Sequence, residues 1–113
     1  MRHRIVLPRG DTRLVSFKVS GTPAETDRVV MAVRRASGGL VHKMVSKVTP
    51  GKPVQFLLTH DDTEKMREGE YVWDVRYVRN PTLDADGMVT GGEEVETFYR
   101  ESPLEVVKVV TDL

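Results

Sequence analysis

The residues best placed to do chemistry lie between positions 82 and 93, where acidic side chains follow one another at a spacing used by calcium-binding loops. With Thr82 counted as the first position, Asp84, Asp86 and Glu93 occupy the third, fifth and twelfth positions of an EF-hand loop, and Gly87 the sixth. However, the first position lacks an acidic ligand, and the flanking sequences are typical of strands rather than helices. Asp-x-Asp-Gly is also a common turn sequence. We interpret the segment as a β-loop, with calcium binding through Asp84, Asp86 and Glu93 as the alternative.

Other residues that could form a reactive site are scattered. The three histidines, His3, His42 and His60, have no metal-ligand spacing and are expected at the surface. The chain has no cysteine, and its serines have no adjacent histidine and do not lie in the Gly-x-Ser-x-Gly motif of a nucleophile elbow. We therefore expect no cofactor and no enzymatic activity.

Length and composition limit the number of domains, the partners and the location that can be expected for this chain. A chain of 113 residues is expected to form a single domain, 1–113, with a core of its own. Its 17 basic and 17 acidic residues balance, which disfavours nucleic acid and anionic membranes as partners. The apolar run Ile5–Leu7 is too short for a signal peptide, so we expect the protein to be made and kept in the cytoplasm unless a larger assembly carries it out.

Apolar and polar residues alternate along most of the chain, which predicts strands. Gly38 and Gly39 predict a hairpin, and residues 80–92 a long loop. About seven strands, with a single helical turn and no regular alternation of strands and helices, predict an all-β, antiparallel sandwich, and the corner described below indicates that it is immunoglobulin-like. The predicted strands cover residues 14–20, 28–35, 40–48, 54–59, 71–78, 93–100 and 104–110, and residues 1–9 are an N-terminal arm or an edge strand.

A short helix is expected where the chain crosses between the two sheets. Thr59 and Asp62 have the spacing of a capping box, and Gly69 follows where such a helix should end. Tyr71 then comes at the start of the next strand, the position of the tyrosine corner in immunoglobulin-like sandwiches. These residues, together with Trp73, predict a structural corner rather than an active site.

Tyr71, Trp73 and Tyr77 alternate along one face of the strand that follows this corner. Large aromatic side chains on a central strand usually belong to the core. The alternative is an exposed platform on which a carbohydrate could stack. The sequence therefore leaves a ligand-binding module, for calcium or for sugar, as the rival to a structural one.

The order of these motifs is similar to that of a known family. Gly10-Asp11-Thr12, the pair Leu58-Thr59, and Gly69-x-Tyr71-x-Trp73-Asp74-Val75 resemble small immunoglobulin-like domains of tailed-phage and prophage structural proteins, among them the N-terminal domain of baseplate upper proteins. This resemblance implies a non-catalytic virion component, in the tail, baseplate or head, that binds copies of itself or neighbouring proteins. The chain departs from the family at Trp73 and in the 80–92 loop.

The last predicted strand has apolar side chains on both faces. Such a strand is either covered on both sides or is an edge that waits for a protein partner. We expect an oligomer, with this strand as a candidate interface. Its apolar residues are Leu104, Val106, Val107, Val109 and Val110.

Overall fold

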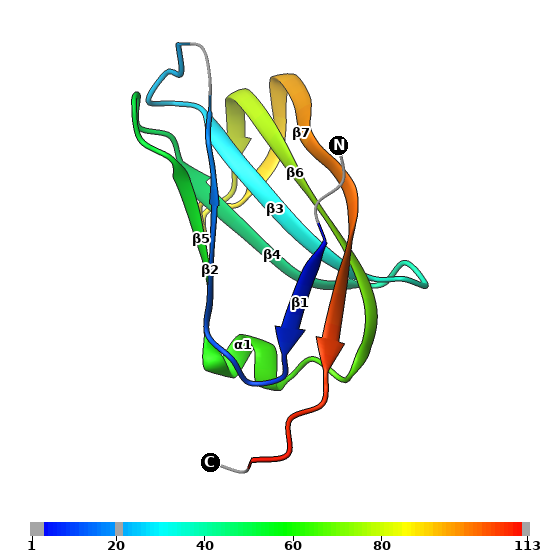
Figure 1. Ribbon diagram of the computed structural model, residues 1–113. Helices are drawn as coiled ribbons and strands as arrows, with labels where there is room; N and C mark the ends of the chain where they lie inside the picture. Colours follow the sequence, from blue (N-terminus) through cyan, green and yellow to red (C-terminus); the bar gives the residue numbers. More distant parts are fainter. Residues whose placement is uncertain (1–3, 20–21, 112–113) are drawn as a thin grey trace.

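The computed structural model describes residues 4–19 and 22–111, and these residues are mostly β-structure with one short helix (Figure 1). The prediction of an all-β chain is thereby confirmed. No helix in the described part of the chain is long and apolar enough to cross a membrane. The elements in chain order are β1 (Ile5–Pro8), β2 (Arg13–Phe17), β3 (Arg28–Arg35), β4 (Leu40–Lys47), β5 (Val54–Leu58), α1 (His60–Glu64), β6 (Gly69–Leu83) and β7 (Val89–Val107).

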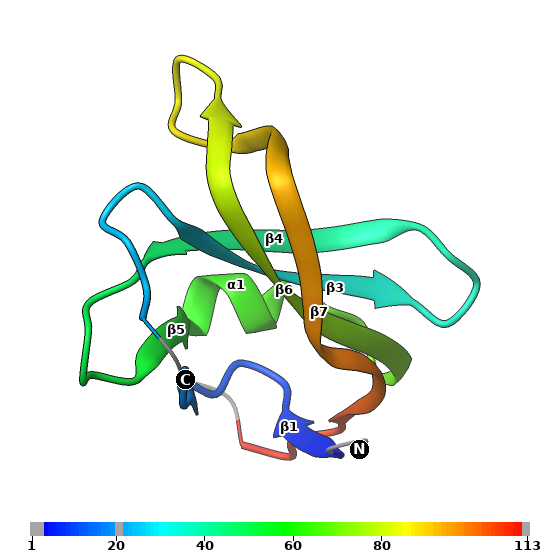
Figure 2. The same cartoon turned by 90° about the horizontal axis from the view of Figure 1, so that it is seen from above.

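The strands form two sheets that lie on opposite sides of the core. One sheet has five strands in the order β1-β7-β6-β3-β4, and the other pairs β2 with β5 (Figures 1 and 2). The neighbours are antiparallel except for β1, which runs parallel to β7. The prediction of a wholly antiparallel arrangement was therefore wrong. Local alternation cannot reveal that pairing, because it joins the two ends of the chain, with Ile5 opposite Leu104.

The β3–β4 hairpin confirms the turn predicted at the paired glycines. Gly38 has a φ of 112°, a conformation that glycine adopts without steric cost. Along β3, Val29, Met31 and Val33 are completely buried, whereas the residues between them face the other side of the sheet. Every second side chain of β3 is therefore buried, as the alternation in the sequence predicted.

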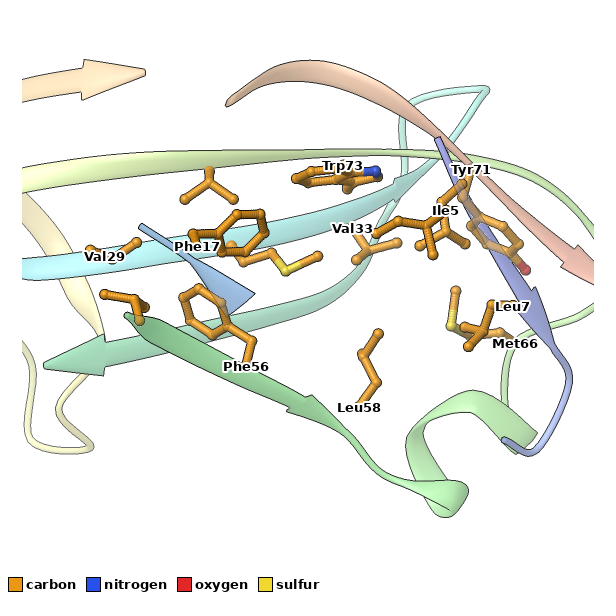
Figure 3. Packing of buried hydrophobic residues seen from close by; sticks show 14 of the residues in the cluster. Ile5, Leu7, Phe17, Val29, Val33, Phe56, Leu58, Met66, Tyr71 and Trp73 are labelled. Atoms are coloured by element: carbon orange, nitrogen blue, oxygen red, sulfur yellow. The ribbon is translucent and has the colours of Figure 1, made fainter. Parts of the chain in front are cut away.

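The core fills the space between the two sheets, and the aromatic side chains at its centre come from both sheets (Figure 3). The Phe17 ring lies 6.0 Å from that of Phe56 and 5.6 Å from that of Trp73, measured between centroids. Offset and tilted ring pairs of this kind each add about 0.5–1.5 kcal/mol beyond the burial of their area. Phe17 on β2 therefore links the small sheet to the large one.

The long loop and the two separate strands predicted after residue 80 were wrong. β6 continues to Leu83 and β7 runs without interruption from Val89 to Val107, so only residues 84–88 connect them. Turn-forming residues, Pro81 among them, had suggested the loop, and Pro103 lies between the two strands that were predicted separately. Both prolines lie where the strand has a neighbour on one side only, since β3 pairs with β6 no further than Val78, and β1 meets β7 first at Leu104. The missing N–H is tolerated there.

Helix α1 lies where the chain crosses from β5 in the small sheet to β6 in the large one. Thr59 is its N-cap: the Thr59 hydroxyl accepts a hydrogen bond from the Asp62 backbone N–H at 3.2 Å. In return, the Thr59 N–H donates to the Asp62 carboxylate at 2.9 Å. This is the reciprocal capping box that the spacing of the two residues predicted.

Candidate functional site

Tyr71 holds the crossing between the two sheets in place. Its hydroxyl donates a hydrogen bond of 2.7 Å to the backbone carbonyl of Arg67, four residues earlier. Gly69, between them, has a φ of 142° and begins β6. Because Arg67 takes part through its carbonyl, its side chain is free to be basic where other tyrosine corners carry an acidic residue.

A buried carboxylate that sequence reasoning missed lies at the other end of β6. Asp27 is 3% exposed. Its carboxylate accepts hydrogen bonds from the Tyr77 hydroxyl at 2.5 Å, the Ala24 N–H at 3.0 Å and the Asn80 N–H at 3.2 Å. Burial alone would raise the pKa of Asp27, but these hydrogen bonds and the nearby Arg79 outweigh burial and lower it. Burial and the bond to Asp27 raise the pKa of Tyr77 to about 12.

The residues of the possible calcium loop have other partners. One Asp84 carboxylate oxygen accepts hydrogen bonds from the N–H groups of Asp86 and Met88, each at 2.9 Å, and so caps the turn between β6 and β7. The Glu93 carboxylate accepts a bond of 3.1 Å from the Asn80 side chain. Within residues 4–19 and 22–111, no three histidine, aspartate or glutamate side chains are grouped so as to hold a metal ion. The turn geometry thus explains the Asp-x-Asp-Gly sequence.

The described histidines lie at the helix and beside it. His60 is hydrogen-bonded through Nδ1 to the Gly10 carbonyl oxygen at 2.5 Å, and the His42 Nε2 atom lies 3.8 Å from the Asp62 carboxylate. The hydrogen bond from the Thr59 backbone is the largest of the effects that lower the pKa of Asp62, and His42 adds to it. His3 lies outside the described residues.

The aromatic residues of β6 are buried rather than displayed. Tyr71, Trp73 and Tyr77 are 7%, 2% and 2% exposed. Their rings therefore offer no exposed platform for a sugar. The Trp73 indole packs against Phe17 and Tyr99, and its Nε1 atom has no hydrogen-bond partner in the described part of the chain.

The last strand is not the uncovered edge that we had considered. Leu104 and Val106 are buried in the core and Val107 is half-buried, while β1 pairs with this part of β7 and closes its edge. Val109 and Val110 follow the strand and are exposed. The apolar run is therefore explained by a strand covered within its own chain.

Within the described residues, open edges remain at β1 and β4 of the large sheet and at both strands of the small sheet, and the small sheet adds an exposed pair of leucines. Leu14 of β2 and Leu57 of β5 are partners in register, and their side chains are 53% and 51% exposed on the outer face. The next outward-facing pair, Ser16 and Gln55, is also exposed and carries no charge. Among the described residues, no further strand pairs with β2 or β5, so each strand has an open edge. Open edges present unpaired backbone N–H and C=O groups.

A second surface feature lies on the outer face of the large sheet. The end of the β6–β7 hairpin projects from this face, away from β1 and β5 (Figure 2). Between the hairpin and strands β3 and β4 is a groove of about 310 Å³, with apolar and basic side chains in its lining. Sequence reasoning missed this groove because no local pattern shows that the hairpin lies beside those strands.

Comparison with known proteins gives no relative from which a role could be transferred: scans against protein-family models, curated protein sequences and solved structures found no match.

Proposed function

We propose that this chain is an immunoglobulin-like, non-catalytic assembly module that works through protein–protein contacts made by its small sheet. Other copies of the same chain are the partners. The observation that carries this proposal is the β2–β5 sheet, with an exposed leucine pair on its face and an open edge on each strand within the described residues.

Strand order and the corner support the immunoglobulin-like assignment. In such sandwiches strands C, F and G form one sheet, strands B and E belong to the other, and a tyrosine near the start of strand F bonds back to the crossing. Here β3, β6 and β7 are neighbours, β2 pairs with β5, and Tyr71 bonds to Arg67. The chain differs from the constant-type pattern because β4 extends the large sheet and no partner lies beyond β5 in the described residues.

Physical chemistry supports an interface at the small sheet. A two-stranded sheet is barely stable by itself in water, and here its inner face is held by the core through Phe17. Its outer face would bury two leucines and no charge against a partner. Complete burial of an exposed leucine side chain contributes about 1.5–3 kcal/mol, and about half of that remains to be gained at each of these half-exposed leucines. Covering Ser16 and Gln55, which carry no charge, costs less than covering ionised groups would.

A place in a phage particle is part of the proposal. It rests on the pattern Gly69-x-Tyr71-x-Trp73-Asp74-Val75 and its resemblance to phage structural domains. Neighbouring genes for capsid, tail-tube or tape-measure proteins would support this placement. Neighbouring genes for metabolic enzymes would argue against it.

The test is self-association measured by sedimentation velocity over a range of concentrations. We expect the wild-type chain to associate reversibly and the double variant Leu14→Glu/Leu57→Glu to be monomeric, because its four carboxylates would face one another across the interface. Leu83→Glu is the matched control, since Leu83 is also exposed, at 38%, but lies at the tip of the β6–β7 hairpin. It should associate like the wild type.

Two results would contradict the proposal. One is a wild-type chain that stays monomeric at every concentration. The other is an oligomer that survives the Leu14/Leu57 double substitution unchanged. Circular dichroism of each variant establishes that the substitutions, both on exposed positions, leave the fold intact.

A further inference from the structure

The hairpin that forms one wall of the groove is held in a bent shape by its own residues. At Asn80 the backbone takes a φ of 46°, unusual for a residue with a side chain, and the Asn80 N–H is bonded to the buried Asp27 carboxylate. Beyond this bend, Gly92 lies so close to Val78 that an added Cβ would be 2.3 Å from a Val78 methyl carbon. Val78 is buried although it lies on the outer face of the sheet. The bend at Asn80 and the contact between Gly92 and Val78 therefore hold the hairpin wall of the groove in place.

The lining of the groove combines an apolar floor with an excess of positive charge. Val30 and Ala32 of β3 contribute apolar surface, and Arg34, Lys43 and Arg76 bring three positive charges against the single carboxylate of Asp74. The charged side chains of the lining therefore carry a net charge of +2, three positive charges minus one negative charge. Val95 adds apolar surface from the hairpin.

These cations are available to a ligand. Among the described residues, neither Lys43 nor Arg76 forms an ion pair within 4.0 Å, and Lys43 only reaches the Val89 carbonyl at 3.5 Å. Burial raises the pKa of Asp74, although Arg76 and Arg34 act in the opposite direction. An approaching carboxylate would therefore meet more positive than negative charge in the lining of the groove.

We propose that this groove binds an extended acidic peptide segment of a partner protein, in which acidic and aliphatic residues alternate. Val30 lies directly opposite Arg76, and Ala32 opposite Lys43, so apolar and basic side chains are neighbours on this face of the sheet. A segment in which aliphatic and acidic residues follow one another places one of each against such a pair. A volume of about 310 Å³ suits a few side chains rather than a large cofactor.

A single-stranded nucleic acid fits the groove less well. Sites of that kind combine basic residues with aromatic rings on which bases stack. No aromatic side chain lines this groove. The inference does not depend on the proposed assembly role, because the groove and the leucine pair lie on outer faces of different sheets.

The test is fluorescence anisotropy with a labelled peptide, Gly-Glu-Val-Glu-Leu-Glu-Gly, and a second peptide with lysine in place of each glutamate. We expect the acidic peptide to bind at low ionic strength, with an affinity that falls as salt is added, and the basic peptide to bind at least about tenfold more weakly. Equal binding of the two peptides, or no binding of the acidic one, would overturn the proposal. So would tighter binding of an oligothymidylate.

Two variants locate the binding site. Lys43→Glu/Arg76→Glu should weaken binding of the acidic peptide at least about tenfold, whereas Lys52→Glu/Lys108→Glu, which makes the same change in net charge at exposed positions outside the groove, should weaken it far less. Gly91 belongs to the lining and nothing lies within 4 Å of an added Cβ, so Gly91→Leu is sterically tolerated, adds bulk at the groove without altering charge, and should also weaken binding. Equal effects of the two double variants, or unchanged binding by Gly91→Leu, would refute the site.

Discussion

Replacing Asp27 with alanine is the most informative single perturbation of this fold. The Asp27 carboxylate receives three hydrogen bonds, and one of them comes from the buried hydroxyl of Tyr77. Removing the carboxylate therefore leaves a hydroxyl without a partner inside the protein. The same carboxylate holds the bend of β6 at Asn80, so its loss also frees the hairpin beside the groove.

The expected cost follows from the burial of each donor. The Tyr77 hydroxyl has no route to water in a residue that is 2% exposed, and leaving such a group unpaired costs about 1–3 kcal/mol. The Ala24 and Asn80 residues are exposed, so water can replace part of their bonds, at about 0.5–1 kcal/mol each. We expect Asp27→Ala to lower the free energy of unfolding by about 3 kcal/mol in total.

A double-mutant cycle with Tyr77→Phe tests this reasoning more sharply than the single variant. In the wild type, Tyr77→Phe removes one of the three bonds to the Asp27 carboxylate and should cost about 1–2 kcal/mol. In the Asp27→Ala background the same change removes an unpaired buried hydroxyl, so it should cost nothing or stabilise.

Urea unfolding followed by the fluorescence of Trp73, the single tryptophan, provides the measurement. With a slope of about 1–3 kcal/mol/M, a loss of about 3 kcal/mol shifts the midpoint by at least about 1 M. Asp61→Asn, at an exposed position, is the control and should leave the midpoint unchanged. If Tyr77→Phe destabilised both backgrounds equally, the two residues would not be coupled and the account of this cluster would fail.

Low pH should destabilise the protein by protonating the Asp27 carboxylate. Because the pKa of Asp27 is lowered in the folded state, its contribution to stability is present above the unfolded value of about 3.9 and is lost as pH falls through the folded value. The wild-type chain should therefore lose stability below about pH 4 more steeply than Asp27→Ala does. Parallel stability profiles for the two proteins in that range would contradict the lowered pKa.

Three further substitutions probe the corner, the hairpin and the helix. Tyr71→Phe removes the bond to the Arg67 carbonyl and should lower the free energy of unfolding by about 1–2 kcal/mol in urea titrations; an unchanged value would mean that the corner does not hold the crossing. Gly92→Ala places a Cβ against Val78 and should cost about 1–3 kcal/mol, whereas Gly91→Ala, beside it in open space, should cost far less by the same assay. Thr59→Ala removes the N-cap of a short helix and should cost about 1 kcal/mol, with Thr59→Ser restoring most of it.

Local features of the structure could be predicted from the sequence because their causes are local. Alternation along β3 predicted which side chains are buried, since successive residues of a strand face opposite sides. The Thr59–Asp62 pair predicted the capping box, and Gly38 and Gly39 the hairpin between β3 and β4. Tyr71 was placed correctly at the crossing because its hydrogen-bond partner lies only four residues away.

Predictions failed where a neighbour from a distant part of the chain decides the outcome. The break expected at Pro103 is absent because β7 has β6 on one side only at that point. The apolar residues 104–110 suggested an uncovered edge, but β1, about a hundred residues earlier in the chain, pairs with β7 there. The cluster of Asp27 with Tyr77 went unnoticed for the same reason, since 50 positions separate the two residues.

The amino-acid order by itself determined the strands before residue 80, the helix cap, the corner and the aromatic face of β6, because side-chain alternation and backbone capping act over a few residues. Only the tertiary structure decided which edges stay open, which leucines remain in water, and that a bent hairpin forms a basic groove over the large sheet. Those properties arise from contacts between segments far apart in sequence, and the candidate interfaces of this protein depend on such contacts.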